Sequence, residues 1–286
     1  MNIALAIVFG LVSMLGYSFA IVYSQPLARR LGSQQSLFLR GIIVCFILGI
    51  AAIPSFHYLS HEWYVLLALL IGIVGYIPLL SFTHGLKVSR VGIVAPIAGT
   101  SALVTVLLAF FVFHTPLHII QWLAVGVIVL ANVGASINLR DFRSSKLLQL
   151  ISGVPFALVA ALGWGVFFFI LVYPTRVLGP WLTAFLTELG VTMAAGVHLM
   201  SSHERVKLRS LSSSLVIFNA LFIITGTLAY TIGIRKYNLG IMGVLANSPA
   251  LPSVLLAGYV FKEKLTLTEK WAAALMVIGV IGVSIT

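Results

Sequence analysis

The most regular feature of the chain is a succession of long apolar stretches separated by short polar segments. Each stretch has about 20 residues, and at a rise of about 1.5 Å per residue a helix of this length crosses the ~30 Å hydrocarbon core of a bilayer. Apolar and polar residues do not alternate with a period of two, which disfavours a transmembrane barrel of strands. The pattern predicts an all-α membrane protein with ten transmembrane helices at residues 3–23, 36–55, 63–84, 91–113, 119–138, 150–172, 181–200, 214–234, 239–261 and 267–285.

The composition agrees with this interpretation. Of the 286 residues, 60% are hydrophobic and 8% are charged, and the mean hydropathy is +1.14. Because a soluble domain carries about 25% charged residues, this composition excludes a soluble enzyme and a disordered or fibrous protein. The single cysteine, Cys45, excludes a disulfide within the chain.

The net charge of +11 comes from basic residues in the linkers, so it predicts topology rather than nucleic-acid binding. If ten helices alternate in direction, 14 lysines and arginines lie on one side of the membrane and 3 on the other. Because cytoplasmic loops carry the excess, we expect both termini to face outward from the plasma (inner) membrane. The first side receives Arg29, Arg30, Arg40, Lys87, Arg90, Arg140, Arg143, Lys146, Arg205, Lys207, Arg209, Lys262, Lys264 and Lys270, and the other receives Arg176, Arg235 and Lys236.

The chain also repeats itself. When it is shifted by 148 residues, 12 of the 26 positions from 92 to 117 are identical, and Val106–Ala109 falls on Val254–Ala257. The repeat predicts two five-helix units, at 1–143 and 144–286. Since five is odd, the second unit is expected to enter the membrane inverted. Inverted repeats of this kind are typical of secondary transporters, which bind substrate near the midplane between the units and open to either side in turn.

Several motifs resemble the drug/metabolite transporter superfamily, and more narrowly its EamA-type members with two five-helix repeats. The resemblance covers the whole chain and rests on the run Leu228–Tyr237, on Ser248–Leu251, on Lys262–Leu267, and on Leu162-Gly163-Trp164 in the sixth predicted helix. The first unit departs from the family pattern, because Thr115-Pro116 stands where the second has Glu263-Lys264. The resemblance implies export of a small solute. It also implies an inward N-terminus, against the outward one that the charges predict.

Two charged residues lie at equivalent positions of the two units. Glu188 is the only acidic residue deep within an apolar stretch, where a charge costs at least ~2.5–3.5 kcal/mol on insertion scales and marks a pathway or coupling site. It either couples transport to protons, binds a substrate cation, or is protonated and inert. Arg40 is expected about 10 Å from Glu188 along the membrane normal and to extend toward the cytoplasmic interface. Binding a substrate carboxylate is its alternative role.

Prolines at 96, 249 and 252 interrupt the fourth predicted helix of each unit, and broken helices at corresponding places point to a binding region. Polar residues beside them are candidate hydrogen-bonding partners of a substrate, although close helix packing explains the small residues equally well. Three aromatic residues inside predicted helices either line a cavity or pack in the core. The predicted substrate-binding residues are Tyr17, Arg40, Thr100, Ser101, Trp164, Tyr230, Asn247 and Ser248.

Two pairs of histidines four residues apart, His57 with His61 and His114 with His118, are expected on the outer face. They make a metal-binding membrane protein or metal-ion transporter one alternative, and a membrane sensor without transport activity another. The chain has no His-Glu-x-x-His or Gly-x-Ser-x-Gly motif and no ATP-binding loop. We therefore expect no enzymatic activity and no cofactor.

The stretches hold no lysine or arginine at depth apart from Arg40, which disfavours phosphorylated substrates. The sequence as a whole predicts a secondary active transporter, acting as a monomer in the lipid bilayer. It is expected to export a small metabolite, such as an amino acid or a related amphipathic or zwitterionic solute, by alternating access.

Overall fold

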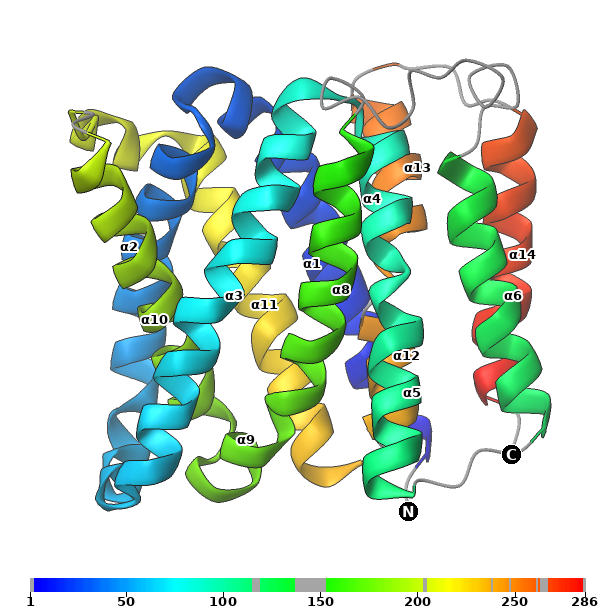
Figure 1. Ribbon diagram of the computed structural model, residues 1–286, viewed down its shortest axis with the longest axis horizontal. Coiled ribbons are helices and arrows are strands. Elements are labelled where there is room, and N and C mark those ends of the chain that lie inside the picture. The colour runs from blue at the N-terminus through cyan, green and yellow to red at the C-terminus, as the bar shows by residue number, and fades with distance from the viewer. Residues whose placement is uncertain are drawn as a thin grey trace.

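The apolar stretches form helices that run the length of the molecule (Figure 1). The computed structural model describes residues 3–114, 119–136, 153–202, 205–237, 239–246, 248–260, 262 and 267–284, and within these residues every regular element is helical and no strand occurs. The first half contains α1 (Ile3–Leu31), α2 (Ser33–Ala52), η1 (Ile53–Ser60), α3 (Glu62–Val88), α4 (Val91–Gly99), α5 (Ser101–Phe113) and α6 (Ile119–Ser136). The second half contains α8 (Val154–Ile170), α9 (Val172–Leu178), α10 (Pro180–Ser201), η3 (Leu208–Ser212), α11 (Ser214–Lys236), α12 (Leu239–Ala246), α13 (Ala250–Val260) and α14 (Leu267–Ser284).

Eight helical segments of the described chain are long and apolar enough to cross a membrane. A shorter apolar helix covers Ile119–Ala131. The all-helical membrane fold predicted from the sequence is thus confirmed, whereas the count of ten crossings stays a prediction. In Figure 1, α1 begins and α14 ends at the same end of the bundle.

The fourth predicted helix of each unit is broken, as its prolines indicate. The stretch 91–113 divides into α4 and α5 at Thr100, and the stretch 239–261 divides into α12 and α13 before Ala250. At the first break, the Thr100 amide and hydroxyl both donate to the Ile97 carbonyl, at 3.1 and 2.7 Å. The backbone therefore turns at this point without leaving the Thr100 amide unpaired.

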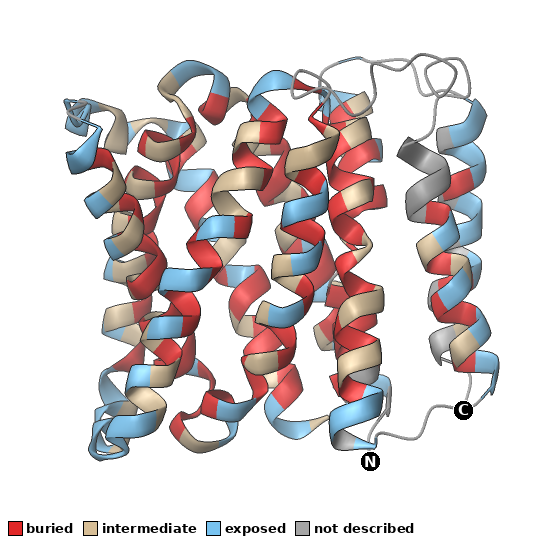
Figure 2. Ribbon diagram, viewed as in Figure 1, coloured by how far each residue is buried: buried red, intermediate tan, exposed pale blue. Residues whose placement is uncertain are grey.

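Buried residues face the interior of the bundle, and many exposed positions on its outside are apolar (Figure 2). Phe46, Phe111 and Val197 expose about two thirds of their surface, at 69%, 67% and 68%. An apolar exterior of this extent suits contact with lipid and would be unfavourable in water.

The two halves pack on each other reciprocally. The first helix of each half lies against the third helix of the other, α1 on α11 and α8 on α3, while α2 packs on α10 and α6 on α14. Gly16 and Gly163 allow these approaches, because a Cβ at Gly16 would lie 2.7 Å from the Gly226 nitrogen and one at Gly163 would lie 2.7 Å from Pro78 Cβ. Small residues at such crossings are typical of helix packing in membranes.

Candidate functional site

A large cavity lies between the two halves of the bundle. Its empty volume is about 990 Å³, including the part that is open to solvent. Side chains from α1, α2, α3, α4 and α5 of the first half and from α8, α10, α11 and α12 of the second half line it. The paired helices α6 and α14 contribute no lining residue within the described chain and stand at one edge of the bundle (Figure 1).

Both buried charged candidates line this cavity. Arg40 from α2 is only 4% exposed, and its Nε has no hydrogen-bond partner among the described residues. Glu188 from α10 is half-buried, and its Oε2 likewise lacks a partner there. The two side chains are close enough to interact electrostatically. A guanidinium group and a carboxyl group therefore belong to the lining of one cavity, and each has one atom without a hydrogen-bond partner among the described residues.

This arrangement corrects the expectation that Arg40 extends to the interface, since its side chain is buried in the bundle. Arg40 lies seven residues into α2 and Glu188 eight residues into α10, which enters from the opposite end. Their Cα atoms are thus separated by only about 8 Å along a ~30 Å span. The long side chain of Arg40 can span much of this distance. The sequence-based expectation compared only the depths of the two backbone positions and left the length of the side chain out.

Aromatic rings form much of the cavity wall. The predicted Tyr17 and Trp164 both line it, together with Phe82, Phe167 and Phe168. The rings of Phe82 and Trp164 lie 4.7 Å apart between centroids, and Tyr17 meets Phe168 edge-on at 5.9 Å. The cavity thus combines a small charged region with an apolar, polarisable wall.

The polar residues beside the helix breaks lie in different environments. Ser101 lines the cavity, whereas Thr100 and Ser248 do not, and Ser248 is fully buried with its hydroxyl donating to the Val244 carbonyl at 2.6 Å. Asn247 lies outside the described residues.

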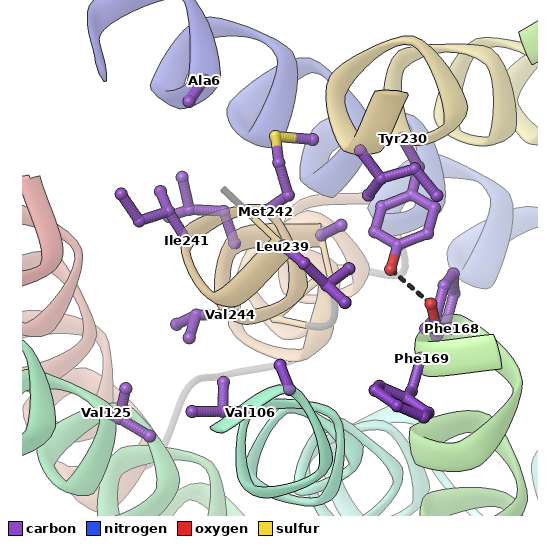
Figure 3. Close-up of a cluster of buried hydrophobic side chains, with 14 of the residues drawn as sticks. Ala6, Val106, Val125, Phe168, Phe169, Tyr230, Leu239, Ile241, Met242 and Val244 are labelled. Carbon is purple, nitrogen blue, oxygen red and sulfur yellow. Dashed lines mark hydrogen bonds between the residues drawn. The ribbon is translucent and has the colours of Figure 1, made fainter. Parts of the chain in front are cut away.

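Tyr230 also lies outside the lining, although the sequence made it a candidate. It is fully buried in the hydrophobic cluster of Figure 3, and its hydroxyl donates to the Phe168 carbonyl at 2.7 Å. Because Phe168 lines the cavity, Tyr230 supports the wall from behind.

Two features of the site were not predicted from the sequence. Phe167 and Phe168 follow Trp164 by three and four residues, so helical spacing already places all three on one face of α8. Asn219 of α11 is fully buried, and its Nδ2 donates to the Ala20 carbonyl at 2.7 Å and to Ser24 Oγ at 2.9 Å. A buried amide needs such partners, and this requirement was a usable signal.

Within the part of the chain that the structure describes, no group of three or more His, Cys, Asp or Glu residues gathers. His57 and His61 are exposed and bond to carbonyls of their own turn, at 3.0 and 3.3 Å. His114 ends α5 in a left-handed conformation, and His118 lies outside the described residues.

The fold and the site thus define an all-helical bundle of membrane-protein character, with a cavity between its two halves. The family model of the EamA-like transporter family matches residues 4–137 and again residues 151–285, so the chain belongs to this family of membrane transporters. The two matches confirm the two-repeat architecture.

A solved structure, described only as the crystal structure of a protein, has a similar fold. It is 19% identical in sequence, with a TM-score of 0.72 over 97% of this chain and 94% of that one. A search of curated proteins finds no match.

Proposed function

We propose that this protein is a secondary active transporter, without enzymatic activity, that exports a small zwitterionic metabolite such as an amino acid across the plasma membrane. The observation that carries the proposal is the cavity shared by both units, in which Arg40, Glu188 and aromatic rings face one space.

The proposed mechanism is alternating access by two inverted five-helix units. The reciprocal packing of α1 on α11 and of α8 on α3 supports it, because two units exchange partners in this way when an approximate twofold axis relates them. An odd number of helices in each unit places that axis in the membrane plane. Rocking of the units about the cavity would then open it to the two sides in turn.

The charges favour a substrate that carries both signs. Arg40 would bind the carboxylate through charge-assisted hydrogen bonds, and Glu188 would bind the ammonium group. Phe82, Trp164 and Phe167 would contact an apolar or aromatic side chain of the substrate. A zwitterion satisfies both charged side chains at once, which a singly charged solute cannot do.

Glu188 would also couple export to protons. When the substrate leaves, its ammonium group no longer balances this carboxylate, and an incoming proton can take its place. Exchange of proton for substrate at one carboxylate requires no further acidic residue in the cavity.

Reconstituted vesicles test this function directly. We expect labelled zwitterionic amino acids to be taken up by counterflow, and Glu188→Gln or Arg40→Gln to lower kcat/KM by about tenfold to a hundredfold, since each removes a charge-assisted hydrogen bond. A pH gradient should stimulate uptake by the unmodified protein but not by Glu188→Gln. The matched control is Glu62→Gln, because Glu62 is exposed at the start of α3 and outside the cavity.

Folding of each variant is checked by size-exclusion chromatography and thermal unfolding. If well-folded Glu188→Gln and Arg40→Gln transport zwitterions as fast as Glu62→Gln, the two charges do not bind the substrate. If uptake by Glu188→Gln still responds to the pH gradient, proton coupling does not act through this carboxylate.

A further inference from the structure

A second pocket lies at the end of the bundle opposite to the start of α1 and the end of α14. Its empty volume is about 790 Å³, including the part open to solvent. Its lining residues come from the start of α2, the last turns of α3 and α10, and the first turn of α8, so both units contribute to its wall. Its polar lining residues are Ser33, Gln34, Ser81, His84, Lys87 and His198.

The start of α2 carries backbone amides that no side chain caps. Gly32 precedes the helix with a φ of 88°, and no side chain caps this end of the 20-residue helix. The first backbone amides of a helix have no partner within it and carry a partial positive charge. A helix start of this kind is suited to an anion.

Ser33 provides an independent sign of a missing ligand. The residue lines the pocket and is only 7% exposed, yet its hydroxyl has no hydrogen-bond partner among the described residues. A buried hydroxyl without a partner is unfavourable, and an anion in the pocket would provide the acceptor.

Neighbouring side chains give the pocket a fixed shape. His198 of α10 bonds to Gln34 Nε2 at 2.8 Å and to the Tyr76 hydroxyl at 2.9 Å, which links α10, α2 and α3. His84 lies against the ring of Phe156, with the ring centroids 4.6 Å apart. The geometry is therefore maintained by contacts between four helices.

The charge that lines this pocket is positive. Lys87 lines it from the exposed end of α3, and none of its lining residues is acidic. The exposed Arg205 and Lys207 belong to the linker that follows α10, one of the pocket's own helices. By the charge bias of the linkers, this end is expected to face the cytoplasm, where anionic lipids and phosphorylated metabolites are found.

We propose that this pocket binds a phosphoryl group, with the Ser33 and Gln34 amides at the start of α2 and the Ser33 hydroxyl donating hydrogen bonds and Lys87 contributing charge. The group belongs either to a soluble phosphate or to the headgroup of an anionic phospholipid. This site is separate from the central cavity, so it does not depend on the proposed transport function.

Binding is measured on the purified full-length protein with two probes. Titration calorimetry with inorganic phosphate in a neutral detergent reports a soluble ligand. Native mass spectrometry from nanodiscs of phosphatidylcholine mixed with phosphatidylglycerol reports a retained lipid. We expect saturable binding of at least one probe, weakened about tenfold by Ser33→Ala and again by Lys87→Gln.

The matched control is Lys207→Gln, which removes an exposed cation near the same end that does not line the pocket. Its binding should equal that of the unmodified protein. Equal weakening by Lys87→Gln and Lys207→Gln would show attraction to net charge alone, and binding of neither probe would show that the pocket holds no phosphoryl group. Either result overturns the proposal. Lys87 is exposed, so its substitution gives a valid result even if Ser33→Ala fails to fold.

Discussion

Two tyrosines in the bundle occupy different environments. Tyr17 lines the cavity and its hydroxyl donates to Thr227 Oγ1 at 3.2 Å, whereas Tyr230 is fully buried behind Phe168. In the sequence, both tyrosines lie inside apolar stretches and cannot be told apart. Only their orientation distinguishes a residue that faces the cavity from one that supports its wall.

We predict that Tyr230→Phe lowers the free energy of unfolding and leaves the substrate affinity nearly unchanged. The variant removes a buried 2.7 Å hydrogen bond to the Phe168 carbonyl, a loss of about 1 kcal/mol, but no group that faces the cavity. Thermal unfolding measures the first effect and counterflow KM the second.

Tyr17→Phe is the matched comparison and should show the opposite balance. It removes a hydroxyl at the cavity wall, so KM should rise more than it does in Tyr230→Phe, and the unfolding temperature should fall less. If Tyr230→Phe instead raises KM as strongly as Tyr17→Phe does, Tyr230 contacts the substrate in a conformation other than this one.

Residue type led to several of the positions that line the cavity, but it did not show which way a side chain faces. Arg40, Glu188, Tyr17, Trp164 and Ser101 were all selected from the sequence, and all line the cavity. Orientation depends on how helices far apart in sequence cross. Periodicity within one apolar stretch of a membrane helix does not report this crossing, because lipid and protein interior are both apolar.

At the scale of elements, the crossing of α3 and α10 positions the acidic side of the cavity. A Cβ at Gly72 would contact the Thr187 carbonyl oxygen, and one at Gly190 would contact that of Leu69. Thr187 and Glu188 are consecutive lining residues, so the close approach of these two helices determines where the carboxylate lies.

We predict that Gly72→Ala destabilises the protein by about 1–3 kcal/mol, the usual cost of overpacking, and lowers the transport rate by displacing α10. Thermal unfolding and counterflow measure the two effects. Gly126→Ala is the control, because a Cβ there meets nothing within 4 Å and alanine favours a helix by about 0.5–1 kcal/mol. Equal stability of the two variants would show that α3 and α10 can separate without cost.

Prolines 96 and 249 led to the expectation that both fourth helices are interrupted, and both are. Proline alone does not determine where a helix breaks, because Pro96 lies inside α4, four residues before the break at Thr100, and Pro26 and Pro78 lie inside the unbroken helices α1 and α3. The break between α8 and α9 at Leu171 has no proline at that point and was not predicted. Its backbone is satisfied locally, with the Leu171 amide donating to the Phe167 carbonyl at 3.1 Å.

For the molecule as a whole, the strongest remaining prediction concerns orientation. The start of α1 and the end of α14 lie at one end of the bundle, and the last residues of α3 and α10 lie at the other (Figure 1). Arg40 no longer counts among the linker cations, because it is buried, but the excess of basic residues at the second end persists without it. The termini are therefore expected outside the cell.

Cysteine labelling in intact cells tests this orientation. In a Cys45→Ser background, we expect a membrane-impermeant maleimide to label Asn2→Cys in intact cells and Lys207→Cys only after permeabilisation. The background without an added cysteine should stay unlabelled and serves as the control. The reversed pattern would give the inward N-terminus that the family resemblance implies. Labelling of both positions in intact cells would place them on the same side, which requires an even number of crossings between them and contradicts the ten-helix topology.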